Sequence, residues 1–95
     1  MTSFDDFWGS LAAGGPPDVP DVMKALWWAH KGDWHRAHTL VQEIETVDAA
    51  WVHAHLHRQE GDLENARYWY DRAKREPSSA PLDDEWLQIV RELTR

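Results

Sequence analysis

The sequence predicts an all-α protein, and two observations support this prediction. Apolar residues recur at the three- and four-residue spacing of an amphipathic helix in successive segments, while no segment alternates as a half-buried strand does. Two Gly-Asp pairs, Gly32-Asp33 and Gly61-Asp62, separate helical segments. Because 95 residues are enough for one core and too few for two, we expect a single helical domain over residues 1–95.

The first half of the chain is expected to form three helices. Ser3 is a good N-cap for a helix over residues 4–13, which the Gly- and Pro-rich stretch 14–20 ends. A second helix starts at Pro20, because proline fits a first helical turn, and ends at Gly32. The third begins at Asp33 and runs to about Thr46, and its apolar stripe consists of Trp34, Ala37, Leu40, Val41 and Ile44.

The second half is expected to form three more. Asp48 caps a helix that ends near Glu60, and the helix after Gly61-Asp62 carries an apolar stripe that ends at Ala73. Residues 76–81, with the sequence EPSSAP, form a loop. Asp83 or Asp84 then caps a final helix over residues 83–94.

The chain resembles itself when it is shifted by 29 residues. Gly32-Asp33 then falls on Gly61-Asp62, and the residues before and after the turns pair as Ala25 with Ala54, Trp28 with His57, Trp34 with Leu63, Ala37 with Ala66 and Val41 with Tyr70. Each unit is therefore a helix, a Gly-Asp turn and a second helix. Neither unit can bury its apolar face alone, so the two are expected to stack.

Over residues 21–77 these features resemble the tetratricopeptide repeat, in which small residues such as Ala25 and Ala66 let helices approach closely. The resemblance implies two antiparallel helix-turn-helix hairpins, 21–46 and 48–77, in a right-handed array. The period is shorter than the family's usual value of about 34, and two repeats are fewer than the three or so that solenoids need. We therefore expect the N-terminal helix and the 83–94 helix to cap the ends of the array.

In that family the first helices of successive hairpins line a concave face, which implies a module that binds a protein or peptide partner. Trp51 is the apolar anchor of the expected face, and Arg58, together with one histidine, is placed to bind a carboxylate. The whole set of expected partner-binding residues is Leu26, His30, Trp51, His55 and Arg58. The alternative is that the N-terminal helix, through Phe4, Phe7 and Trp8, fills this face as a permanent lid.

A second functional hypothesis is a small ligand- or metal-binding protein. His53, His57 and Glu60 share one helix face, and two imidazoles and a carboxylate are ligands that one divalent ion accepts. His30, His35, His38 or His55 would supply further ligands, and Tyr68 or Trp69 a wall. The competing interpretation is that His53 and His57 are buried, neutral and purely structural.

Composition limits the remaining classes of function. The net charge of −7 argues against nucleic acid and anionic membranes as partners, and the lack of cysteine excludes disulfides and thiolate sites. The sequence contains no nucleophile or phosphate-loop motif, so we expect a non-enzymatic protein. The acidic N-terminal stretch does not resemble a signal peptide and no run approaches 18 apolar residues, so a cytoplasmic location is expected. Self-association through Trp86, Val90 and Leu93 of the final helix is a further possibility.

Overall fold

The computed structural model describes residues 2–95, and within them it is all-helical, as predicted. The helices in this range are α1 (Phe4–Ser10), α2 (Asp21–His30), α3 (Trp34–Val41), α4 (Val47–Gln59), α5 (Leu63–Arg72) and α6 (Leu82–Leu93). No helix within residues 2–95 combines the length and apolarity needed to cross a membrane.

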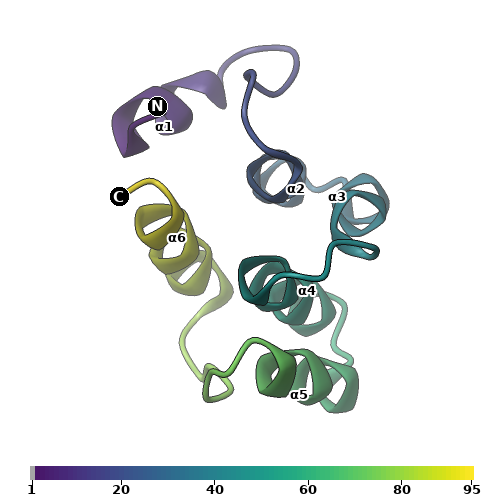
Figure 1. The fold of residues 1–95 in the computed structure, drawn as a ribbon. Helices are drawn as coiled ribbons and strands as arrows, with labels where there is room; N and C mark the ends of the chain where they lie inside the picture. Colours follow the sequence, from purple (N-terminus) through teal and green to yellow (C-terminus); the bar gives the residue numbers. More distant parts are fainter. Residues whose placement is uncertain (1) are drawn as a thin grey trace.

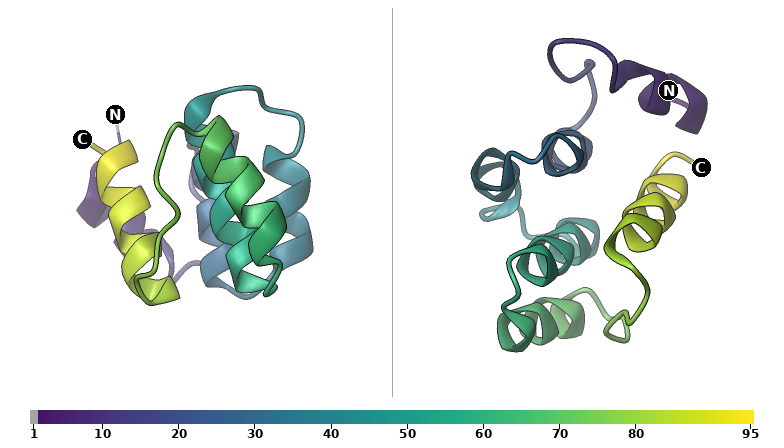
Figure 2. Two further views of the ribbon diagram at one scale, coloured as in Figure 1. Left: turned by 90° about the horizontal axis from the view of Figure 1, so that it is seen from below. Right: turned by 180° about the vertical axis from the view of Figure 1, so that it is seen from behind.

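Four of the helices form two hairpins that stack in a curved row (Figure 1). Helix α2 packs against α3 and α4 packs against α5, while α3 joins the hairpins by packing against α4. Helix α6 lies along the inner side of this row, against α2 and α4, and α1 lies near the C-terminal end of α6 in every view (Figures 1 and 2). The first helix of each hairpin therefore faces α6.

Each Gly-Asp pair ends one helix and begins the next. Gly32 and Gly61 have φ angles of 85° and 84°, a left-handed conformation that glycine adopts without steric cost. The aspartate that follows each glycine accepts a hydrogen bond from a backbone N–H in the first turn of the next helix, at 3.0 Å for Asp33 and 3.2 Å for Asp62. The pair therefore forms a tight turn that folds the second helix back onto the first.

The end of α5 uses the same turn without a glycine. Lys74 has a φ of 60°, and the N–H of Arg75 donates to the carbonyl of Tyr70 at 3.0 Å. At the two Gly-Asp turns, the N–H groups of Asp33 and Asp62 donate the same type of hydrogen bond to the carbonyls of Trp28 and His57. A lysine side chain in this conformation strains the backbone at the start of the loop that leads to α6.

Several predicted helix ends are shifted. Helix α3 stops at Val41 rather than 46, because Thr46 is extended and its side chain, not that of Asp48, caps α4. Helix α1 stops at Ser10. Pro81 rather than Asp83 or Asp84 occupies the N-cap position of α6, and the two aspartates lie in the first turn, where the helix dipole favours them.

The core contains aromatic rings and the apolar side of α6. Trp86, Ile89 and Val90 are buried, and the indole N–H of Trp86 donates to the carbonyl of Leu26 at 2.8 Å. Trp86 and Val90 thus pack within the chain. Self-association through the final helix stays a prediction.

Helix α1 covers the far end of this core. Phe7 is fully buried, with its ring centroid 6.2 Å from that of Trp86, and the indole N–H of Trp27 donates to the carbonyl of Ser10. The alternative in which residues 4–11 fill the concave face is therefore corrected. Helix α6 occupies that face, and α1 packs against Trp86 and Trp27.

Candidate functional site

The residues expected to bind a partner are mostly covered by the chain itself. Leu26 and His55 are 0% exposed and Trp51 is 2% exposed, while His30 is exposed and Arg58 is partly buried. The guanidinium of Arg75 also lies 3.4 Å from the centroid of the Trp51 ring. Partner binding by this face stays a prediction, and it requires α6 to leave.

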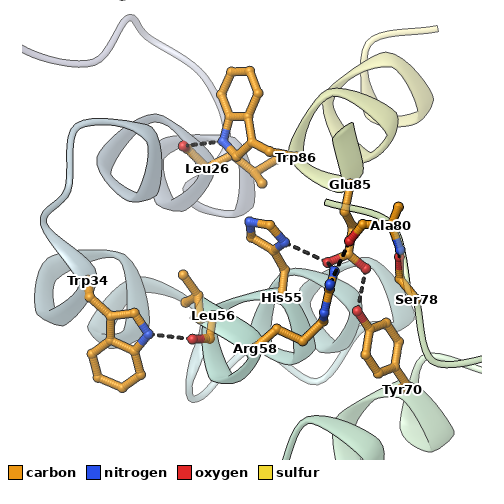
Figure 3. A network of polar contacts seen from close by, with 10 residues as sticks. All are labelled: Leu26, Trp34, His55, Leu56, Arg58, Tyr70, Ser78, Ala80, Glu85 and Trp86. Carbon is orange, nitrogen blue, oxygen red and sulfur yellow. Dashed lines mark hydrogen bonds and ion pairs between the residues drawn. The ribbon is translucent and has the colours of Figure 1, made fainter. Parts of the chain in front are cut away.

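Glu85 on α6 is the centre of a buried polar network (Figure 3). His55 Nδ1 and Arg58 Nη1, both on α4, donate to its Oε1 at 2.7 and 2.8 Å. The hydroxyl of Tyr70 on α5 donates to its Oε2, and Arg58 Nη2 donates to the carbonyl of Ala80 at 2.6 Å. The network thereby connects α6 to both helices of the second hairpin.

The partners of Glu85 keep it ionised. Burial alone would raise the pKa of Glu85, but hydrogen bonds from His55, Tyr70 and Arg58 outweigh burial and lower that pKa below its ordinary value. Burial also raises the pKa of Tyr70, so the phenol remains a donor. The network is a buried ion pair in which both oxygens of Glu85 accept hydrogen bonds, and it fixes the position of α6.

Sequence reasoning missed Glu85. Arg58 was expected to bind a carboxylate of a partner, yet it binds the carboxylate of Glu85 within the chain. A signal was present in the sequence, because Glu85 lies one helical turn before the buried Ile89 and therefore on the apolar side of α6. An acidic residue at such a position requires a buried partner.

The second polar cluster lies between the hairpins and contains three histidines. One ring nitrogen from each of His38, His53 and His57 lies within 4.8 Å of the other two. His38 comes from α3 and the others from α4, where they lie one helical turn apart with stacked rings 4.8 Å apart between centroids. His53 Nε2 and His38 Nε2 are 3.0 Å apart. We call these three residues the histidine cluster.

Glu60 has a different position from the one predicted. Its Oε1 lies 2.5 Å from His57 Nδ1, so the carboxylate accepts a hydrogen bond from that ring nitrogen. This contact fixes the tautomer of His57 and leaves Nε2 with the free lone pair. His38 thus lies with His53 and His57, whereas Glu60 lies on the other side of His57, with Asp62 near it. A metal-ligand role for Glu60 stays a prediction.

Two tryptophans enclose the histidine cluster. The Trp69 ring stacks on His53 at 3.8 Å between centroids, and the Trp34 ring stacks on His38 at 4.7 Å. The indole N–H of Trp34 donates to the carbonyl of Leu56 at 2.6 Å, which holds that ring in place. Trp69 thus forms a wall, as predicted, whereas Tyr68 is 53% exposed and lies at the rim.

Two of the three imidazoles in the cluster favour the neutral form. Burial, followed by the proximity of His38 and His57, lowers the pKa of His53 to about 3. Burial and the nearby His57 also lower the pKa of His38. Neutral imidazoles are the form that binds metal ions, so no proton has to be displaced from His53 at neutral pH.

Comparison of the chain with protein-family models, with curated proteins and with solved structures found no match. The chemistry of the histidine cluster is therefore the basis for a functional assignment.

Proposed function

We propose that this chain is a non-enzymatic metal-binding protein, and that His38, His53 and His57 are the ligands. The observation that carries the proposal is the convergence of three ring nitrogens within 4.8 Å, from two helices that belong to different hairpins. Imidazole is a common ligand for zinc, copper and nickel, and three histidines form a known type of zinc site.

The spacing of the nitrogens fits a metal ion. Bonds of about 2.0–2.1 Å in a tetrahedral site place ligand nitrogens roughly 3.3–3.4 Å apart. His38 Nε2 and His53 Nε2 are 3.0 Å apart, so a shift of only a few tenths of an ångström would admit an ion between them. The contact between Glu60 and His57 supplies the carboxylate–histidine support that is typical of metal sites.

The test is metal binding by tag-free protein. Chain freed of metal by chelation and dialysis should bind one Zn²⁺ per molecule in isothermal titration calorimetry. At a free ion concentration 100 times Kd, binding should raise the free energy of unfolding by about 2.7 kcal/mol.

Single substitutions assign the site. His53→Gln or His38→Gln should abolish the binding, and circular dichroism should show that each variant is still folded. His35→Gln is the matched control, because His35 lies on α3 beside the site but is exposed. Undiminished binding by the folded His53→Gln variant, or no binding by wild type, would disprove the proposal.

A further inference from the structure

We propose that the histidine cluster is built for monovalent copper, Cu(I), in preference to divalent ions. This inference rests on the metal-binding function proposed above and adds the identity of the ion. Two features of the site support it: the charge that the surroundings can balance and the number of ligands that the walls allow.

The first feature is charge. An imidazole ligand contributes no negative charge to a metal site, and the carboxylate in direct contact with the cluster is that of Glu60. Asp62 also lies near His57 and Glu60; both carboxylates are exposed, but the side chain of Asp62 caps α5. The free energy of transferring an ion from water into a protein interior rises with the square of its charge, so a divalent ion costs about four times as much as a monovalent one of similar size.

Glu60 offsets one unit of that charge. A monovalent ion together with Glu60 gives a neutral site, whereas a divalent ion leaves one positive charge among residues that are largely buried. His53 is 4% and His57 5% exposed, whereas His38 is partly buried and Glu60 is exposed, so solvent screens that excess from the side of Glu60 only.

The second feature is coordination number. Zn²⁺ in a three-histidine site keeps a fourth ligand, usually water, and Cu²⁺ prefers a tetragonal arrangement of nitrogen and oxygen ligands. Cu(I) has a filled d shell and is stable with three nitrogen ligands. Trp69 stacks on His53 and Trp34 stacks on His38, so indole rings line two sides of the cluster. An indole N–H is a donor only, so these walls supply no fourth ligand to the ion.

The ligand set also limits the affinity. The chain has no cysteine, so the thiolates that bind Cu(I) most tightly are absent. We therefore expect an exchangeable site that competes with a weak chromophoric Cu(I) chelator such as ferrozine.

The experiment compares two ions on the same protein. Metal-free full-length chain is titrated anaerobically with Cu(I) against ferrozine, and separately with Zn²⁺ against a zinc-sensitive dye. We expect one Cu(I) per chain, with a Kd at least tenfold below that for Zn²⁺. X-ray absorption at the copper edge should show three nitrogen ligands and no water.

Variants of the wall test the reason for the preference. Trp69→Ala opens one side of the cluster and should lower the ratio of the Zn²⁺ Kd to the Cu(I) Kd at least threefold. Trp69→Phe keeps an aromatic wall and should retain most of the preference for Cu(I). Trp28→Ala is the matched control, because Trp28 packs against Trp27 and Arg36 rather than against the histidines. Thermal melts confirm that each variant is folded.

The outcomes separate the two proposals. Zn²⁺ binding as tight as Cu(I) binding, with both lost in His53→Gln, overturns the choice of copper and leaves the metal site in place. Binding of neither ion, or equal binding by His53→Gln, overturns both. An unchanged Kd ratio in a folded Trp69→Ala variant overturns the role of the aromatic walls.

Discussion

Mild acid should destabilise the metal-free protein through His53. The pKa of this side chain falls from 6.5 in the unfolded chain to about 3 in the folded chain, chiefly because of burial. The folded state therefore favours the neutral ring. Stability is full above pH 6.5 and declines as the pH falls from there towards 3.

The loss of unfolding free energy in acid follows from the unfolded and folded pKa values of His53. At pH 7.5 the unfolded ring is nearly all neutral, and the loss of stability is below about 0.1 kcal/mol. At pH 5.5 roughly nine-tenths of the unfolded rings carry a proton while the folded ring stays neutral, and the loss is about 1.4 kcal/mol. His38, whose pKa is also lowered, adds a loss of the same sign.

Urea denaturation at pH 7.5 and 5.5, in the presence of a chelator, measures this difference. We expect wild type to lose at least about 1.4 kcal/mol of unfolding free energy between the two pH values, and His53→Gln to lose less by about that amount. The exposed His35 provides the control, because His35→Gln should keep the wild-type dependence. An identical pH dependence in wild type and His53→Gln would refute the reasoning.

Three further substitutions test other parts of the fold by the same measurement. Glu85→Gln removes the buried charge that Arg58 and His55 contact and should lower the free energy of unfolding by about 2–3 kcal/mol, whereas a loss no larger than that of the exposed Asp84→Asn contradicts the role of the network. Lys74→Gly relieves a φ of 60° and should raise stability by about 0.5–1 kcal/mol, and an equal gain from Lys74→Ala would show that strain is not the cause. Gly61→Ala, at a φ of 84°, should cost about 1–2 kcal/mol, while Gly9→Ala, in open space on α1, should be neutral or stabilising; the reverse order would disprove this account of the turns.

Local patterns predicted the helices because local chemistry determines them. The glycines at 32 and 61 and the aspartates that follow them end and begin helices by contacts within a few residues, so the prediction of both turns was confirmed. The start of α4 was misplaced because Thr46 and Asp48 are both good caps, and the choice depends on where α3 has to stop. Burial of His53, Tyr70 and Ala66 also followed from the repeat and was confirmed.

Contacts between distant segments were not predictable in the same way. Four histidines were equally good candidates for a third ligand, and only the packing of α3 on α4 brings His38 to His53. The partners of Glu85 are 15 to 30 residues away in the chain, so no helical spacing indicates them. Which helix fills the concave face was likewise not predictable, because it depends on which end of the chain folds back onto that face.

The position of α6 fixes how many hairpins the protein can have. An array of stacked hairpins ordinarily lengthens by the insertion of another unit at its end. Here α6 contacts both α2 and α4, and Glu85 and Trp86 bind groups on the second and the first hairpin respectively. A third hairpin inserted after Arg75 would move the start of α6 away from Arg58 and Leu26 and separate it from both sets of partners. The contacts of α6 are therefore compatible with two stacked hairpins, and duplication of a hairpin would require a different C-terminal segment.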